Sequence, residues 1–364
     1  MSNQVRLGLI GAGVSGTWSA RAHLPAVLAS SDMELTAVCT TKAASAEVAR
    51  AAYGARLAFH DYRAMVMSRE IDAAAIVVRV PAHFAPTKAA LEAGKHVYCE
   101  WPLGRTTAEA EELTALATSK GLVTAVGLQA RVNPTLLYMK ELIDAGYVGE
   151  MITVHVSLLR EGVLARPSHR IWQRDVTLGA NTLTIPNGHT LDAMRFVAGE
   201  LGTFTATVVT QVKQWRDTGT GDMLDVTAPD NVLISGRLAN GTVLSSHVGT
   251  IPHAGSGYRM EVYGRDGTLI VSGDDSPQLG EVSLQGSQHG ASLVSLPVPN
   301  RFAFATPGTP AGEPRNVGQM YKLFAKAIGG EPTGLPNFAT ALRLHRLIDA
   351  IQESSDTGRT VTFG

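Results

Sequence analysis

Three glycines near the start of the sequence have a spacing that could hold a phosphate group. Gly11, Gly13 and Gly16 lie in the segment GAGVSG, directly after an apolar run at 5–10. In such a G-x-G-x-x-G turn the first glycine permits a tight turn, the second lets the backbone approach a pyrophosphate, and the third allows close helix–strand packing. A following helix would add amide donors and a positive dipole. The segment therefore predicts a dinucleotide-binding loop.

The residues after the second predicted strand bear on which dinucleotide is bound. A carboxylate there would accept a hydrogen bond from the ribose 2′-hydroxyl of NAD. The sequence instead has Thr40, Thr41 and Lys42 after the strand at 34–39. Two hydroxyls and an ammonium group suit a 2′-phosphate, which favours NADP. The alternative is NAD, with Lys42 as a solvated residue at a helix start.

A second set of candidates surrounds the segment CEWPLGR at 99–105. Trp101 follows a predicted buried strand, at the sheet edge where ligands bind, yet an indole cannot serve as proton donor or base. Its ring could stack on the nicotinamide or on a sugar, or it could be an apolar plug. His83 could hydrogen-bond the nicotinamide ribose or simply begin a helix. Gln129, after another strand, could reach cofactor or substrate.

Exchange of a hydride with an alcohol or carbonyl also needs a group that exchanges the oxygen's proton. His189 is the best candidate, because its side chain has an ordinary pKa near neutrality and it begins a predicted helical segment. Asp192, three residues later, could orient the imidazole, or it could form a salt bridge or a cap. A histidine that only packs or caps the helix is the alternative for His189.

The segment RPSHRIWQRD at 166–175 is rich in arginine. It could cover the site and clamp an anionic or polyhydroxyl substrate, or it could be a solvated loop in an oligomer contact. Arg131 could pair with a carboxylate between domains, and Tyr258 could face the cleft. The predicted cofactor contacts are Gly11, Gly13, Val14, Ser15, Gly16, Thr40, Thr41, Lys42, Val80, His83, Glu100, Trp101 and Gln129. The predicted substrate contacts are Trp101, Arg131, Arg170, Trp172, Asn187, His189 and Tyr258.

Other chemistries lack their motifs. The sequence has no HExxH, CxxC or GxSxG, and its histidines do not cluster at metal spacing, so no metal is predicted. Its two cysteines, Cys39 and Cys99, lie in apolar runs, which argues against a disulfide scaffold and favours a reducing compartment. A net charge of −1 gives no sign of nucleic-acid or membrane binding. With no signal-peptide pattern and no membrane-spanning run, we expect a cytoplasmic protein.

Along the first part of the chain, apolar strand-like runs alternate with helical patterns. The predicted strands cover 5–10, 34–39, 71–78, 95–100 and 122–128, and the predicted helices 43–54, 83–94 and 106–121. Thr107 is the expected N-cap of the last helix, and another helix is expected to end near Ser30. This alternation predicts a parallel, doubly wound sheet in an α/β domain.

From about residue 151 the pattern changes to short runs rich in Val, Thr and Ile, which predict a mainly antiparallel sheet in an α+β domain. Asn-Gly at 240–241 and Asp-Gly at 266–267 are strong hairpin signals. The remaining predicted elements are helices near 133–150, 189–199, 316–329 and 337–353, with long loops at 274–314.

At 364 residues the chain is long enough for two domains. We expect a Rossmann domain at 1–130 and a substrate and oligomerisation domain at 131–364, with closing helices at about 316–353 that could pack back on the first domain. The strands of the second domain have enough apolar residues for both sheet faces. This predicts a homodimer or homotetramer through that sheet.

Three segments together resemble the Gfo/Idh/MocA family, the group of glucose–fructose oxidoreductase and inositol dehydrogenase. They are AALEAGKHVYCEWPLGRT at 89–106, VGLQARVNP at 126–134 and GHTLDAM at 188–194. The resemblance covers nearly the whole chain. It implies a Rossmann domain followed by an open antiparallel sheet, and oxidation or reduction of sugars, inositols or similar polyols with NAD(P).

Two positions depart from the family pattern. Members typically have lysine, the usual catalytic residue, where this sequence has Trp101, and aspartate where it has Ile185. These departures, with PAHF at 81–84 and LQAR at 128–131, look like the galactose-regulon repressor subgroup. The sequence favours an NADP-dependent oxidoreductase for a small hydroxylated or keto substrate (a sugar, sugar acid or polyol), with His189 as acid–base residue. The alternative is a non-catalytic dinucleotide sensor that binds a protein partner.

Overall fold

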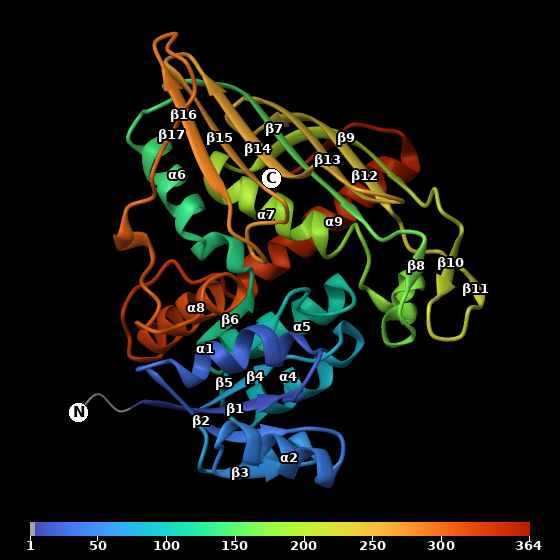
Figure 1. Cartoon of the computed structure of the whole chain (residues 1–364), viewed down its shortest axis with the longest axis vertical. Coiled ribbons are helices and arrows are strands. Elements are labelled where there is room, and N and C mark those ends of the chain that lie inside the picture. Colours follow the sequence, from blue (N-terminus) through green and yellow to red (C-terminus); the bar gives the residue numbers. More distant parts are fainter. Residues whose placement is uncertain (1–3) are drawn as a thin grey trace. The chain divides into compact units, whose positions relative to one another are not determined.

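The computed structural model describes residues 4–364, which form two compact units (Figure 1). The first unit contains the chain up to Gln129 together with Ala303–Arg343. The second contains Ala130–Phe302 and Leu344–Gly364. Each unit is therefore built from two separate stretches of sequence. Within the described residues, no helix combines the length and the apolar character needed to cross a lipid bilayer.

The first unit is built on a parallel sheet of six strands in the order β3-β2-β1-β4-β5-β6. The strands are β1 (Val5–Ile10), β2 (Met33–Cys39), β3 (Leu57–Phe59), β4 (Ala73–Ile76), β5 (His96–Glu100) and β6 (Thr124–Gly127). Every residue of β4 and β6 is buried, as expected for strands covered on both faces. The predicted doubly wound sheet is confirmed. Strand β3 was not predicted, because three residues are too few to show an alternating apolar pattern.

Helices connect these strands. They are η1 (Ser19–His23), α1 (Leu24–Leu28), α2 (Ala43–Tyr53), α3 (Tyr62–Met67), η2 (Val80–Ala82), α4 (Phe84–Glu92), α5 (Thr107–Ser119), α8 (Glu313–Ile328) and the first part of α9 (Phe338–Thr357). The N-cap of α5 is Thr106, whose hydroxyl accepts from the amide of Glu109 at 3.2 Å, so the expected cap at Thr107 was one residue late. The first helix opens with a π-turn, because Pro25 has no N–H to donate to the preceding turn.

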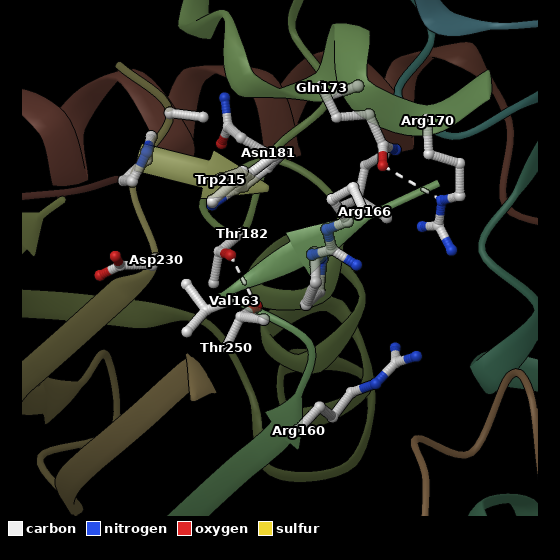
Figure 2. A pocket seen from close by; sticks show the side chains of 15 residues that line it. Arg160, Val163, Arg166, Arg170, Gln173, Asn181, Thr182, Trp215, Asp230 and Thr250 are labelled. Carbon is white, nitrogen blue, oxygen red and sulfur yellow. Dashed lines mark hydrogen bonds between the residues drawn. The ribbon is translucent and has the colours of Figure 1, made fainter. Parts of the chain in front are cut away.

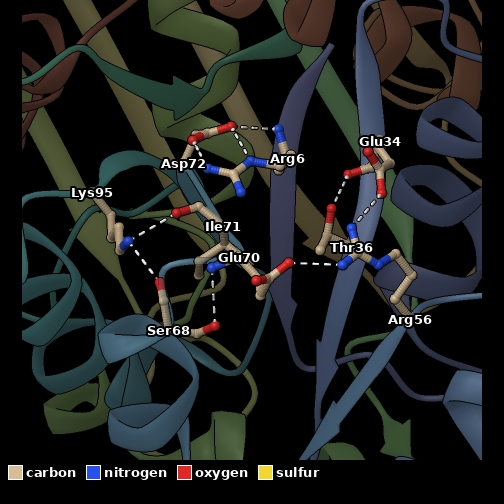
Figure 3. Close-up of polar contacts among 9 residues, drawn as sticks. All are labelled: Arg6, Glu34, Thr36, Arg56, Ser68, Glu70, Ile71, Asp72 and Lys95. Carbon is tan, nitrogen blue, oxygen red and sulfur yellow. Dashed lines mark hydrogen bonds and ion pairs between the residues drawn. The ribbon is translucent and has the colours of Figure 1, made fainter. Parts of the chain in front are cut away.

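Polar contacts fix the amino ends of the parallel strands, at the edge opposite the predicted cofactor residues (Figure 3). Arg6 near the start of β1 donates from Nε and Nη2 to the two carboxylate oxygens of Asp72, at 3.0 and 2.6 Å. Lys95, just before β5, donates to the carbonyls of Ser68 and Ile71, both at 2.8 Å. These contacts join β1, β4 and β5 where each strand begins.

The second unit contains a sheet of nine strands in the order β17-β16-β15-β14-β7-β13-β12-β9-β18. The strands are β7 (Met151–Glu161), β9 (Leu201–Val209), β12 (Asn231–Leu238), β13 (Val243–Ile251), β14 (Gly257–Gly264), β15 (Gly267–Gly273), β16 (Ser283–Gln288), β17 (Val294–Ser295) and β18 (Val361–Thr362). β7 and β13 pair in parallel and the other neighbours are antiparallel. The predicted antiparallel sheet and the hairpins at 240–241 and 266–267 are confirmed.

Two expectations for this unit were wrong. The stretch 274–314 is not only loop, because it contains β16 and β17. The strands are also not apolar on both faces. In β7 the side chains of Val154, Val156 and Leu158 are buried, whereas the intervening positions, among them His155 and Ser157, are not. Counting apolar residues per strand overlooked this alternation.

Helices and a small sheet complete the second unit. The helices are η3 (Gln129–Val132), which begins in the first unit, η4 (Ser168–Arg174), η5 (Val176–Leu178), η6 (Asn300–Phe302), α6 (Pro134–Asp144), α7 (Pro186–Ala198) and the second part of α9. α6 and α7 pack against the large sheet. The small sheet consists of β8 (Ala165–Arg166), β10 (Gln214–Asp217) and β11 (Met223–Asp225). Its core is formed by Trp215, Val226 and Ala228.

Candidate functional site

The glycine-rich loop lies between β1 and η1, where only glycine fits at two positions. A Cβ on Gly11 would lie 2.1 Å from the carbonyl oxygen of Val77, and Gly11 has a positive φ of 95°. A Cβ on Gly13 would lie 2.8 Å from Cγ2 of Thr17. Gly11 thus lets the loop pass close to the backbone that follows β4, and Gly13 leaves room for the side chain of Thr17.

The outer part of this loop exposes backbone amides. Val14, Ser15 and Gly16 are exposed, and in the described part of the chain their amides donate to no acceptor. Carbonyls of the loop are satisfied instead: Ser19 donates to Gly11 at 2.6 Å and Tyr53 to Gly13 at 3.1 Å. A loop with free donors and covered acceptors fits an anionic group, so its residues suit the pyrophosphate of a dinucleotide.

The end of β2 carries the residues that the sequence predicts to lie near the 2′-position of a bound ribose. Thr41 and Lys42 are exposed, and Lys42 is the N-cap residue of α2. The hydroxyl of Thr40 donates to the carbonyl of Lys42 at 3.1 Å and also contacts Ser45 Oγ at 2.7 Å. The Thr40 hydroxyl is therefore part of the local turn, whereas Thr41 and Lys42 present their side chains to solvent.

A buried polar cluster lies at the end of β5 and was not predicted as a cluster. The carboxylate of Glu100 accepts from His23 Nε2 at 2.8 Å and from Gln129 Nε2 at 2.9 and 3.0 Å. The other ring nitrogen of His23 contacts the hydroxyl of Tyr321 at 2.8 Å. Burial and the charge of Glu100 raise the pKa of Tyr98 and Tyr321 well above the ordinary value, so both phenols stay protonated. Glu100 is thus held by neighbours from several elements.

Gly127 explains how this carboxylate is accommodated. Glu100 and Gly127 are register partners on β5 and β6. A Cβ on Gly127 would lie 2.5 Å from Oε2 of Glu100, so any larger residue would push the carboxylate away. The glycine in the VGLQ segment is required by the acidic side chain beside it.

Trp101 and His83 form the next part of this sheet edge. Trp101 is only 4% exposed, which leaves little of its ring open to solvent. The ring nitrogens of His83 contact the carbonyls of Pro102, at 2.7 Å, and Val78, at 3.0 Å. Burial lowers the pKa of His83, although both carbonyl contacts act in the opposite direction. His83 therefore ties the residues after Trp101 to the end of β4, and Val80, in η2, is also buried.

In the second unit, the first turns of α7 carry the predicted proton-exchanging residue. His189 is 7% exposed and Asp192 is fully buried. Both carboxylate oxygens of Asp192 accept from Arg131, from Nε at 2.8 Å and from Nη2 at 2.7 Å. This bidentate ion pair connects α7 to η3, and it is the salt bridge that was one of the two roles predicted for Asp192.

Two other predicted substrate contacts are buried. Asn187 in α7 donates to the carbonyl of Leu183 at 3.3 Å, and its Oδ1 has no donor among residues 4–364. Tyr258 lies in β14, is 1% exposed, and its hydroxyl contacts Met260 Sδ at 3.8 Å. Burial raises the pKa of Tyr258. Tyr258 is a core residue of the large sheet.

A pocket of about 110 Å³ lies within the second unit (Figure 2). It lies where the end of β7, the 161–182 segment, the start of α7 and the small sheet meet. Of the predicted substrate contacts only Arg170 lines it, whereas Trp172 belongs to the same helix, η4. The lining residues are Arg160, Val163, Arg166, Arg170, Gln173, Ala180, Asn181, Thr182, Ile185, Pro186, Trp215, Ala228, Pro229, Asp230 and Thr250.

The structure brings the predicted cofactor contacts together. They lie at the ends of β1, β2, β4, β5 and β6, whose carboxyl ends meet at one edge of the parallel sheet. The predicted substrate contacts are not brought together in this way: Trp101 follows β5 in the first unit, and the others are spread over η3, η4, α7 and β14 of the second. Sequence reasoning missed His23, Tyr321, Arg160 and Trp215, which no local pattern connects to their partners. In the described residues, no group of three or more His, Cys, Asp or Glu side chains is placed to hold a metal ion.

Comparison with known proteins gives separate matches for a part of each unit. Residues 5–128 match the model of the oxidoreductase family with an NAD-binding Rossmann fold, GFO_IDH_MocA. Residues 134–273 match the C-terminal domain of Gal80p. Residues 5–128 are thus similar to the Gfo/Idh/MocA family. The resemblance inferred from the sequence motifs is confirmed for these residues, and residues 134–273 of the second unit are similar to the C-terminal domain of Gal80p.

Relatives of this chain include both dehydrogenases and regulators. The dehydrogenase aclE of Aspergillus oryzae is 29% identical, over 75% of this chain and 78% of its own length. The galactose/lactose metabolism regulatory protein GAL80 of Saccharomyces cerevisiae is 25% identical, over 98% of this chain and 94% of its own. Levoglucosan dehydrogenase of Pseudarthrobacter phenanthrenivorans is 26% identical, over 85% of this chain and 84% of its own length.

Solved structures show the same fold. A super-repressor mutant of Gal80p from Saccharomyces cerevisiae has a TM-score of 0.88, with 22% identity, covering 99% of this chain and 98% of its own. Levoglucosan dehydrogenase in complex with NADH and L-sorbose has a TM-score of 0.86, with 22% identity, covering 100% of this chain and 99% of its own. At these identities the similarity establishes the fold of the two units.

Proposed function

We propose that this protein is a dehydrogenase that uses NAD(P)(H) to interconvert a hydroxyl and a carbonyl group on a sugar, a sugar acid or a related polyol. One observation carries the proposal: within the second unit, a small polar pocket borders the helix that holds His189. Ile185 and Pro186 line the pocket, and His189 lies about one turn further along α7. A pocket of about 110 Å³ suits a group of a small molecule better than a protein segment.

His189 is the proposed proton acceptor. In oxidation a ring nitrogen of His189 takes the hydroxyl proton of the substrate, and in reduction it returns that proton to the forming alcohol. A nicotinamide bound to the glycine-rich loop supplies or accepts the hydride. The Arg131–Asp192 ion pair holds α7 against η3 and so limits the movement of His189. Proton and hydride together account for the two hydrogens exchanged.

The family's usual lysine and aspartate are replaced by Trp101 and Ile185. Positioning of the reacting groups and one proton-exchanging residue can supply much of the rate effect of a dehydrogenase, so these replacements are compatible with catalysis. The levoglucosan dehydrogenase relative, whose solved structure holds NADH and L-sorbose, gives sugar chemistry additional support.

A second candidate is a dinucleotide-dependent regulator that binds another protein. It is favoured by the Gal80p-type C-terminal domain, together with Trp101 in place of lysine. The two candidates differ in one property that can be measured directly, which is turnover.

The test is a screen of aldoses, uronic acids, inositols and their keto forms with NADP(H) and NAD(H), followed at the nicotinamide absorbance. We expect turnover of at least one substrate in the wild type. We expect His189→Ala to lose 10²-fold or more in kcat, about the range of general acid–base catalysis, while still binding the dinucleotide. The matched control is His289→Asn, an exposed residue of the second unit with a positive φ of 50° that asparagine tolerates.

Two results would overturn this proposal. Dinucleotide binding without turnover across the whole panel would favour the regulator. Full activity of His189→Ala would remove His189 from the mechanism, even if the protein is a dehydrogenase.

A further inference from the structure

Three arginine side chains converge on the pocket of the second unit (Figure 2). Arg160 comes from β7, Arg166 from β8 and Arg170 from η4. The acidic residue of the lining is Asp230. The formal charge of the lining side chains is therefore positive, and the question is how much of that charge is already balanced within the protein.

The carboxylates at the two sides of the pocket are engaged by other groups. Asp230 accepts from the backbone amides of Gln211 and Val212 at 2.7–3.0 Å, which uses its acceptors but leaves its negative charge in place. Arg160 forms an ion pair with Asp275 at 3.4 Å. In the described residues, neither Asp230 nor Asp275 forms an ion pair with the arginine in the middle of the pocket.

Arg166 is that arginine. It pairs with no carboxylate in the described part of the chain, and its buried Nε has no hydrogen-bond acceptor there. Its guanidinium carbon lies 5.0 Å from the centre of the Trp215 ring, which orients the group through a cation–π contact. An arginine whose guanidinium packs on an aromatic ring and whose charge has no carboxylate partner is well suited to bind an anion.

Trp215 forms the wall of the pocket beside Arg166. The residue is 5% exposed, lines the pocket, and packs on Val226 and Ala228. Its Nε1 is buried and has no acceptor among residues 4–364. The ring of the indole therefore holds the Arg166 guanidinium, while its N–H stays enclosed in the protein.

We propose that this pocket binds an oxyanion, a carboxylate or a phosphate, through Arg166 and Arg170. This inference rests on the proposed function and makes it more specific. The substrate is a sugar that carries a negative charge, and the neutral sugars are poor ligands. The volume of about 110 Å³ fits one such group, while the rest of the substrate lies outside the pocket.

The ionisation of Arg166 agrees with this assignment. Burial, followed by the charges of Arg170 and Arg160, lowers the pKa of Arg166 to about 10. The guanidinium therefore remains charged at neutral pH, but it is held in a position where positive charge is disfavoured. A bound anion would relieve this repulsion.

Direct binding tests this proposal without requiring turnover. The full chain is titrated with inorganic phosphate, D-glucuronate, glucose 6-phosphate and D-glucose, with heat and tryptophan fluorescence as readouts. We expect at least one of the three anions to bind at least about tenfold more tightly than D-glucose, since each charge-assisted hydrogen bond is strong. The carboxylate and phosphate arms show which oxyanion is preferred.

The variants identify the pocket. Arg166→Met is expected to weaken anion binding by about tenfold or more, and Arg166→Lys, which keeps the charge but loses the planar fork, by a smaller factor. Arg216→Met is the matched control, because Arg216 is exposed, follows Trp215 in β10 and does not line the pocket. Thermal unfolding of each variant verifies that it is folded. Unchanged binding in folded Arg166→Lys and Arg166→Met proteins would overturn the assignment.

The result can be separated from that of the proposed function. Absence of binding for all three anions, together with turnover of a neutral sugar, would overturn the oxyanion site and leave the dehydrogenase. Anion binding that Arg166→Met abolishes, without turnover of any compound, would support the pocket and overturn the dehydrogenase.

Discussion

At the scale of single residues, several side chains are engaged differently from what their types alone suggest. For Asp192 the sequence left two roles open, orienting the imidazole of His189 or forming a salt bridge, and both its oxygens accept from Arg131. Both ring nitrogens of His83 contact backbone carbonyls. By contrast, Thr41 and Lys42 remain exposed at the end of β2. Among these residues, Thr41 and Lys42 are the ones whose side chains remain open to solvent.

Lys42 is expected to decide the preference for NADP(H). Lys42→Ala should weaken NADP(H) binding about tenfold, the loss of about 1.4 kcal/mol, because one charge-assisted contact to the 2′-phosphate disappears. Binding of NAD(H) should change little. Fluorescence titration with both dinucleotides measures this difference.

The matched control for Lys42 is Lys120→Ala. Lys120 is also exposed, and its ammonium group donates to the carbonyl of Glu92, so both affinities should stay unchanged. Tighter binding of NAD than of NADP by the wild type would contradict the 2′-phosphate assignment.

At the scale of elements, the two edges of the parallel sheet differ in the residues they carry. The carboxyl edge carries the predicted cofactor residues, and its buried cluster around Glu100 requires Gly127 on the neighbouring strand. The amino edge is held by Arg6, Asp72 and Lys95. A substitution at the amino edge can therefore change the free energy of unfolding without altering the residues at the carboxyl edge.

Asp72→Asn is expected to destabilise the protein at neutral pH by up to about 1 kcal/mol, since the Arg6–Asp72 pair is partly exposed. Burial alone would raise the pKa of Asp72, but the hydrogen bonds and charge of Arg6 outweigh it and lower the pKa. The stabilisation is therefore present above the unfolded pKa of about 3.9 and is lost as pH falls through the lower folded pKa.

Urea unfolding followed by circular dichroism, at pH 7 and near pH 3, measures the effect of Asp72→Asn. The difference from the wild type should shrink at the acidic pH. Asp144→Asn, in an exposed pair with Lys140, is the control and should have little effect at either pH. A difference that grows on acidification would contradict the assigned direction.

At the scale of the whole molecule, the open face of the nine-stranded sheet is the surface on which self-association is expected. That face is mostly polar, with Ser235, Ser245 and His155 in one row across three strands. Leu233, 43% exposed, and Val243, 47% exposed, add apolar area. A face of this composition resembles a hydrogen-bonded interface more than an apolar core.

We expect a dimer or a dimer of dimers at micromolar concentration. Leu233→Arg should shift the protein toward monomer, because it places a charge in the apolar part of this face. Met223→Arg is the control, because Met223 is exposed on β11 of the small sheet. Sedimentation velocity distinguishes the species, and a monomeric wild type would remove the expectation.

The sequence by itself determined the elements and their local rules. The glycine spacing at 11–16, the strand–helix alternation and the hairpins at 240–241 and 266–267 depend on neighbours within a few residues, so they can be recognised in one chain. The parallel and antiparallel sheets followed from these patterns. The short strand β3 and the strands in 274–314 escaped because their apolar periods are too brief or too polar.

Only the tertiary structure decided which side chains meet. Glu100 meets His23, 77 positions away, and His23 meets Tyr321, 298 positions away. The pocket likewise joins Arg166 to Trp215 from separate strands. Strand order and register set such pairs, and both depend on packing of segments distant in sequence, which no local window contains. For the same reason the sequence could nominate Arg170 as a ligand contact, whereas the unmatched charge of Arg166 beside an indole became visible only in the folded chain.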